Sequence, residues 1–155
     1  MLGIKGVLTA AAIWAVLVHS PLAADETSVS RKTGEGNTMI RINVIVGDTT
    51  LSASLDNSPA ARDFASMLPL ELTLSEYAGN EMVADLGRKL DTTGAPASYK
   101  PKTGDITQYS PWSNLAIFTK PFSASRGLIR LGEFDGPIDA LTVGGNVTAR
   151  LERAD

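Results

Sequence analysis

Side chains able to carry acid–base or nucleophilic chemistry are scarce in this sequence. It contains no cysteine, and its one histidine, His19, lies within the first 24 residues. If those residues are removed, a Ser-His-Asp triad, a Cys-His pair and a histidine-containing zinc site are all excluded. Acid–base catalysis would then fall to carboxylates, lysine or tyrosine, whose ordinary pKa values lie far from neutrality. We therefore assign no catalytic residue, no metal ligand and no cofactor, and we favour a binding role over an enzymatic one.

Two candidate binding residues lie in a proline-containing turn. Trp112 offers a flat apolar face, and the amide of Asn114 can pair with a peptide backbone. A competing structural interpretation is that Trp112 closes one end of the fold while Asn114 holds the turn. The usual burial of tryptophan favours this second interpretation.

Three further residues add polar and aromatic candidates. Arg126, next to a glycine, can hold a carboxylate or a carbonyl oxygen near exposed backbone. Its alternative role is an ion pair with an acid such as Asp135 or Asp105. Tyr99 lies in a loop rich in glycine and proline, which makes it a candidate for ligand contact. Tyr109 fits either the binding site or the core.

The elements that would position these side chains are mostly short strands. Apolar and polar residues alternate in Ile40–Val46 and again in Thr49–Leu55, which indicates a β-hairpin. A helix is predicted from Asn57 or Ser58 to Pro69, because capping residues and a proline precede an apolar stripe at helical spacing. We expect further strands at residues 70–74, 82–86, 105–109, 115–119, 127–133 and 146–152, a loop at 92–104, and a short helix or turn at 137–141. Many short strands without an internal repeat are typical of a small, mainly β barrel or sandwich.

The first 38 residues differ in composition from the rest. Residues 1–24 contain a lysine near the terminus, an apolar run and then small residues, which is the layout of a secretory signal peptide cleaved after Ala24. The alternative is an uncleaved anchor, although the apolar run is shorter than the about 20 residues that a membrane span needs. Residues 25–38 are polar and predict a flexible linker. We therefore expect a periplasmic or secreted protein with one domain at 39–155 and no membrane span after signal cleavage.

The net charge of the chain argues against one class of partner. The formal net charge is −3, and charged residues make up 20% of the sequence. Nothing in this balance suggests attraction to nucleic acid, which proteins bind through clustered basic residues. We expect no nucleic-acid partner.

Three stretches resemble a known family. They are ARDFASMLPLELTLSEYAGNEMVADL, GDITQYSPWSNLAIF and SRGLIRLGEFD, and the second, which ends at Phe118, is the most specific. Together they are similar to a bacterial family of small cyclophilin-like proteins without an assigned reaction. The similarity runs from about Met39 to Arg153. The resemblance implies a closed or nearly closed cyclophilin-like β-barrel of about eight strands with one or two short helices.

The resemblance does not carry the activity of true cyclophilins to this chain. Those proteins are peptidyl-prolyl isomerases whose groove uses an arginine, a phenylalanine, a methionine and a glutamine in one short signature, with a histidine elsewhere. That signature is absent here, and the sole glutamine, Gln108, lies in another motif. Three functions follow in order of preference. The first is a binding domain for a peptide segment or small molecule, the second an isomerase with a non-standard groove, and the third a structural or protein-interaction domain.

Overall fold

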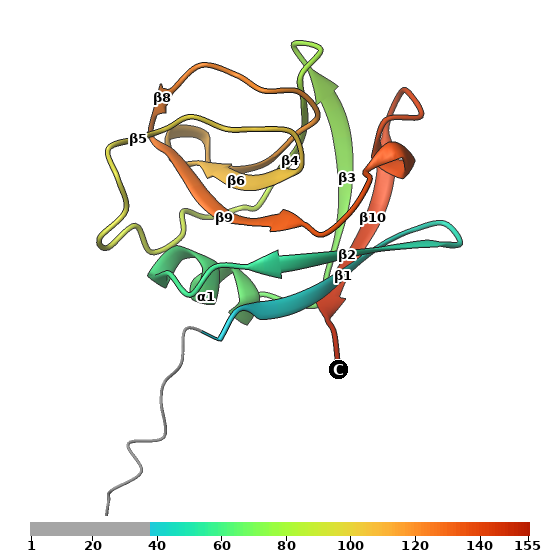
Figure 1. Cartoon of the computed structure of the whole chain (residues 1–155), viewed down its shortest axis with the longest axis horizontal. Helices are drawn as coiled ribbons and strands as arrows, with labels where there is room; N and C mark the ends of the chain where they lie inside the picture. Colours follow the sequence, from blue (N-terminus) through green and yellow to red (C-terminus); the bar gives the residue numbers. More distant parts are fainter. Residues whose placement is uncertain (1–37) are drawn as a thin grey trace, which may run out of the picture. The chain divides into compact units, whose positions relative to one another are not determined.

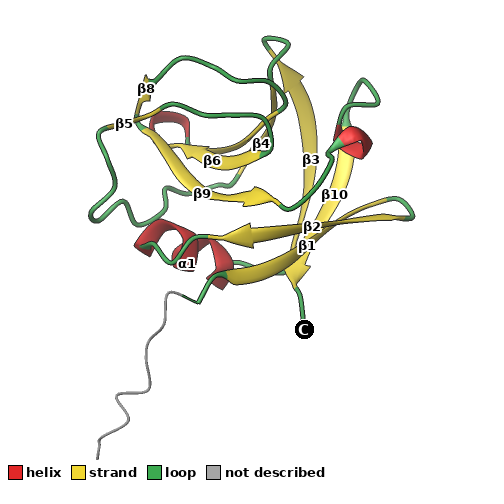
Figure 2. Cartoon of the chain, viewed as in Figure 1, coloured by secondary structure: helices red, strands yellow, loops and turns green. Residues whose placement is uncertain are grey.

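The computed structural model describes residues 38–155, drawn in colour in Figure 1. The predicted signal peptide at 1–24 lies outside the described residues, as does the predicted linker at 25–38 except for its last residue. The described part is built mainly from strands (Figure 2). Its elements in chain order are β1 (Ile40–Val46), β2 (Thr49–Leu55), α1 (Pro59–Ser66), β3 (Leu70–Tyr77), β4 (Glu81–Asp85), β5 (Ser98–Tyr99), β6 (Asp105–Tyr109), the 3-10 turn η1 (Ser110–Trp112), β7 (Asn114–Phe118), β8 (Ser125–Arg126), β9 (Leu128–Phe134), the 3-10 turn η2 (Asp139–Leu141) and β10 (Val147–Arg153).

Eight of the strands close into a barrel. They follow one another around it in the order β1, β10, β3, β4, β7, β6, β9 and β2, and β2 pairs with β1 to complete the ring. Every pairing is antiparallel. The expected mainly β, closed barrel is therefore confirmed, with one helix and two 3-10 turns.

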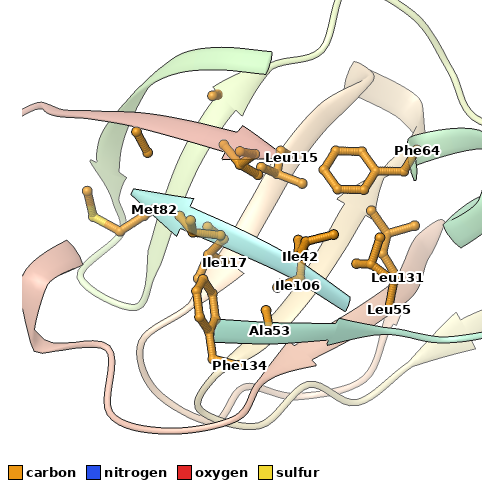
Figure 3. Packing of buried hydrophobic residues seen from close by; sticks show 14 of the residues in the cluster. Ile42, Ala53, Leu55, Phe64, Met82, Ile106, Leu115, Ile117, Leu131 and Phe134 are labelled. Atoms are coloured by element: carbon orange, nitrogen blue, oxygen red, sulfur yellow. The ribbon is translucent and has the colours of Figure 1, made fainter. Parts of the chain in front are cut away.

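The helix α1 begins where the sequence provides a cap. The Ser58 hydroxyl accepts a hydrogen bond from the Ala61 N–H at 3.1 Å, and Pro59 occupies the first helical turn, where its missing N–H has no consequence. Phe64 is fully buried and points into the cluster that contains Leu115 and Leu131 (Figure 3). The helix thus contributes an aromatic side chain to the barrel core.

The barrel interior is filled by one parity of each strand. On β4 the inward residues are Met82 and Ala84, and on β7 they are Leu115 and Ile117. This is the period-two pattern from which the strands were predicted. Where β9 passes β2, the core leaves no room for a side chain, because a Cβ on Gly132 would lie 2.7 Å from the Leu55 Cα.

The opposite face of β7 is buried as well. Ala116 and Phe118 pack with Leu128 in a second apolar cluster, with Val83, Tyr99 and Tyr109 packed against it. Since neighbouring residues of a strand point to opposite faces, this cluster lies on the outer surface of the barrel wall. The nearly continuous apolar run in β7 therefore serves two separate clusters.

A small additional sheet accompanies this outer cluster. β5 and β8 pair with each other, with Ser98 opposite Arg126, and lie side by side near the start of β9 (Figure 1). β5 falls inside the segment at 92–104 that the sequence predicts as a loop, and β8 was not predicted at all. Two residues are too few to show a period, so such strands are recognisable only from their pairing. We call the segments that carry β5 and β8, residues 97–104 and 119–127, the strap.

Candidate binding site

A pocket of about 480 Å³ opens on the outer surface of the barrel wall. The second apolar cluster supplies part of its lining, and the strap supplies one side. Its lining residues come from β3, β4, β6, β7, β8, β9 and η1, and they are Tyr77, Glu81, Val83, Tyr109, Trp112, Asn114, Phe118, Ser125, Arg126 and Leu128. We call it the Trp112 pocket. Its size lies within the range common for sites that bind small ligands.

Trp112 forms an exposed aromatic wall of this pocket. Its ring lies at right angles to two tyrosine rings, with centroid distances of 5.2 Å to Tyr109 and 6.2 Å to Tyr77. Both contacts are edge-to-face, an arrangement that aromatic pairs prefer. The residue is 62% exposed, so the expectation that it closes the fold as a buried plug is wrong. The turn η1 carries Trp112, and the two tyrosine rings pack against it.

Arg126 lines the same pocket from β8 without an ionic partner among the described residues. The expected alternative, a pair with Asp135 or Asp105, is wrong because other arginines occupy those acids. Arg41 lies 3.1 Å from Asp135, and Arg130 lies 3.8 Å from Asp105. The exposed guanidinium is thus available to a ligand, with several donors for a carboxylate or carbonyl oxygen.

Two backbone hydrogen bonds of Gly127, the residue after Arg126, hold this part of the chain between two neighbouring segments. The Gly127 N–H donates to the Ala97 carbonyl at 3.2 Å, and the Gly127 carbonyl accepts from the Ser110 N–H at 2.8 Å. Gly127 has a φ of +77°, and a Cβ there would lie 2.9 Å from Pro111 Cδ. Glycine therefore permits both the left-handed backbone and the close approach of the strap to η1. These contacts set the arginine beside the tryptophan.

Asn114 starts β7 at the base of the pocket. Its side-chain oxygen is buried and has no hydrogen-bond partner. The turn before it is closed by backbone groups instead, through a bond of 3.3 Å from the Ser113 N–H to the Ser110 carbonyl. The interpretation that the Asn114 side chain holds the turn is therefore wrong. A buried oxygen without a hydrogen-bond partner is costly, and no donor within residues 38–155 satisfies this one.

Glu81 brings a carboxylate to the pocket, although no motif or spacing in the sequence indicated this role. It begins β4 with its side chain on the outer face, partly buried, and it forms no ion pair within residues 38–155. Burial disfavours its charged form, so the pKa of Glu81 is raised above its ordinary value. The Trp112 pocket thus contains one carboxyl group, that of Glu81, and one guanidinium, that of Arg126. Neither forms an ion pair among the described residues.

Tyr99 does not reach this pocket. Its hydroxyl donates to Asp105 Oδ2 at 2.7 Å, and burial together with this bond raises the pKa of Tyr99 to about 12. The side chain instead lines a smaller cavity of about 260 Å³ beside Arg130 and the start of α1. The structure therefore gathers Trp112, Asn114, Arg126 and Tyr109 in one pocket and places Tyr99 elsewhere.

Several lining residues escaped sequence reasoning. Tyr77 lies beyond the predicted end of its strand, because β3 continues past Leu74 to Tyr77. Val83 and Leu128 resemble ordinary core residues, and only their outward direction brings them to the pocket. The apolar alternation stops at Leu74, because the next position of the same parity is the charged Glu76, so the pattern did not indicate the longer strand.

The glutamine of the central motif has a structural role. Gln108 is fully buried, its Oε1 accepts from the Leu90 N–H at 2.9 Å, and its Nε2 donates to the Arg88 carbonyl at 3.0 Å. It thereby ties the segment after β4 to the barrel. Gln108 does not line the Trp112 pocket.

With this geometry, comparison with known proteins identifies the family. Residues 44–152 match the cyclophilin-like family. The chain belongs to this cyclophilin-like family. A search of curated proteins finds no match. Among solved structures, this cyclophilin-like domain is similar to a hypothetical protein from Archaeoglobus fulgidus determined in solution, with 17% identity and a TM-score of 0.52, over 78% of this chain and 99% of the other. That likeness supports the fold alone.

Neither a membrane-spanning helix nor a cluster of metal-ligating side chains occurs in residues 38–155. Within residues 38–155, no helix has the length and apolarity needed to cross a membrane. In the same part of the chain, no three His, Cys, Asp or Glu side chains gather in a way that could hold a metal ion.

Proposed function

We propose that this cyclophilin-like protein is an exported, non-catalytic binding domain that holds a peptide segment or small molecule in the Trp112 pocket. The observation that carries the proposal is the pairing of an exposed indole wall with an unpaired arginine in one concave site. An exposed tryptophan loses apolar contact with water when a ligand covers it, which supplies affinity. The arginine supplies orientation.

The non-catalytic part of the proposal rests on the chemistry of the pocket. Its lining residues include neither a histidine nor a cysteine, the side chains that most readily act as proton carrier and nucleophile. A prolyl-peptide isomerisation assay is the relevant check, because isomerisation needs neither a nucleophile nor a proton donor. We expect the uncatalysed rate, and a rate above it would contradict this part.

Export rests on the composition of residues 1–24. The proposed location is the periplasm or the outside of the cell. The N-terminal sequence of the protein recovered from its native host should begin just after Ala24. A mature chain that begins at Met1 would contradict export by cleavage.

Ligand binding can be measured through the fluorescence of Trp112, which lines the pocket. The sequence has two tryptophans, Trp14 and Trp112, so a full chain carrying Trp14→Phe reports only on the pocket. We expect a saturable change in its fluorescence with at least one member of a panel of amino acids, short peptides and small anions. Arg126→Gln should weaken that binding, whereas the control Arg150→Gln, on the exposed side of β10, should not.

The same panel can contradict the proposal. A ligand whose affinity, measured by calorimetry, is equal in the parent chain, Trp112→Ala and Arg126→Gln binds elsewhere. No response to any member of the panel would favour the third alternative, a structural or interaction domain.

A further inference from the structure

The Trp112 pocket contains two opposite charges that do not meet. Arg126 enters from β8 and Glu81 from the start of β4, and in the described part of the chain neither has an ionic partner. Four other arginines of the domain pair with acids, as Arg88 does with Asp63 at 2.6 Å, whereas Arg62 and Arg153 form no ion pair in the described residues. Two opposite charges without ionic partners in one concave site suit a ligand that supplies both counter-charges.

The surface between these charges is apolar. Val83, Phe118 and Leu128 belong to the outer cluster, and the indole of Trp112 stands at its side. A ligand that spans the two charges must therefore bring an apolar body to this surface.

These requirements exclude simpler ligands. An anion alone would meet the repulsion of Glu81, and a cation alone would meet that of Arg126. An uncharged peptide segment would cover both charges without pairing either of them, which is unfavourable. A ligand with an ammonium group, a carboxylate and an apolar side chain meets these three conditions.

We propose that the Trp112 pocket binds short apolar peptides with both termini free, with the carboxylate at Arg126, the ammonium at Glu81 and a side chain against Trp112. This inference rests on the proposed function and names the ligand class for that site. It differs from recognition of an internal peptide segment, because here the two chain ends supply the specificity.

The test uses a set of leucine peptides with two and three residues. Each is prepared with both ends free, with the amine acetylated, with the carboxylate amidated, and with both ends blocked. Calorimetry with the full chain should show binding of at least one free-ended peptide. Each single block should weaken that binding by about 10- to 100-fold, the usual effect of losing a charge-assisted hydrogen bond.

Protein variants assign each end to its residue. In Arg126→Gln, amidation of the peptide should no longer weaken binding, while acetylation still should. In Glu81→Gln the pattern should reverse. Arg150→Gln and Glu71→Gln are matched controls on exposed strand positions outside the pocket and should leave the parent pattern unchanged.

The outcomes separate this inference from the proposed function. Equal binding of the free and doubly blocked peptides would overturn the requirement for free ends. If that binding still fell in Trp112→Ala, the pocket would remain a peptide site and the proposed function would stand. Failure of every peptide in the set to bind would overturn this ligand class, whereas the broader panel of ligands decides the proposed function. An effect of amidation that persists unchanged in Arg126→Gln would overturn the assigned orientation.

Discussion

Arg126 and Arg130 lie four residues apart, yet they differ in their ionic contacts. Arg130 lies 3.0 Å from Asp56, 3.7 Å from Glu133 and 3.8 Å from Asp105. Arg126 has no such neighbour in the described residues and lines an open pocket. The same side chain thus serves structure in one region and remains available for recognition in the other.

The region around Arg130 is a connected network. Asp105 is fully buried there and accepts hydrogen bonds from the Tyr99 hydroxyl at 2.7 Å and the Lys102 N–H at 2.8 Å. Lys102 also pairs with Glu133 at 2.7 Å, which raises the pKa of Lys102 and lowers the pKa of Glu133. These contacts join the strap to β6 and β9. The network supports the Trp112 pocket without entering it.

The largest expected effect on stability comes from adding a methyl group to the barrel wall at Gly132, two residues beyond Arg130. In Gly132→Ala the new methyl group would strike the β2 backbone at Leu55, so β2 and β9 must separate. We expect a loss of about 3 kcal/mol in the free energy of unfolding, measured by urea denaturation. Gly136→Ala is the matched control, because a Cβ there meets nothing within 4 Å. Equal stability of the two variants would contradict the close approach of β2 and β9.

The second prediction compares the two arginines directly. Arg130→Gln removes the cation from three acids, one of which is fully buried, and should lower the free energy of unfolding by about 2 kcal/mol. Arg126→Gln should change it by less than about 0.5 kcal/mol, as is usual for an exposed side chain without partners. Urea denaturation of both variants at one pH measures the difference. Similar losses of stability in the two variants would contradict the proposal that Arg130 stabilises the fold while Arg126 is available to a ligand.

The third prediction concerns the tyrosine that joins the network. Tyr99→Phe removes its bond to Asp105 and should lower the free energy of unfolding by about 1 kcal/mol at pH 8. The pKa of Tyr99 is raised from 10.0 to about 12, so folding favours its neutral form. This contribution is therefore present below pH 10 and is lost as the pH rises towards about 12.

Two measurements check the tyrosine prediction. The stability difference between Tyr99→Phe and the parent chain should shrink across that pH interval. A tyrosinate absorbance step near pH 12 should also be missing from Tyr99→Phe. A parent chain without this late step would contradict the buried hydrogen bond.

The smallest expected effect on stability belongs to Glu81. Burial raises its pKa above the ordinary value of 4.5, so at neutral pH the charged form opposes folding. Glu81→Gln should therefore cause no loss of stability at pH 7, and any gain should vanish as the pH falls through the raised pKa. Urea denaturation at pH 7 and pH 4 measures this, with Glu71→Gln as the control. A clear loss at pH 7 would show a structural role for Glu81 and weaken its assignment to a ligand.

Most of the barrel could be predicted from the sequence, because alternation reports directly which strand face is buried. It located β1, β2, β6, β7, β9 and β10 closely, and Ser58 and Pro59 located the start of α1. The strap could not be found in this way. β5 and β8 are too short for a pattern, and their place depends on backbone bonds such as that from Gly127 to Ala97.

The sequence by itself determined the strand pattern, the family and the shortage of catalytic side chains, because these depend on residue type and local spacing. Only the tertiary structure decided which charges remain unpaired. Arg126 and Arg130 look equivalent along the chain, but closure of the barrel brings Asp56 from β2's end and Asp105 from β6 to Arg130 alone. The same closure brings Glu81 to the pocket of Trp112, although 31 positions separate them in the sequence numbering (112 − 81). Charge pairing depends on distance in space, which spacing along a strand does not encode.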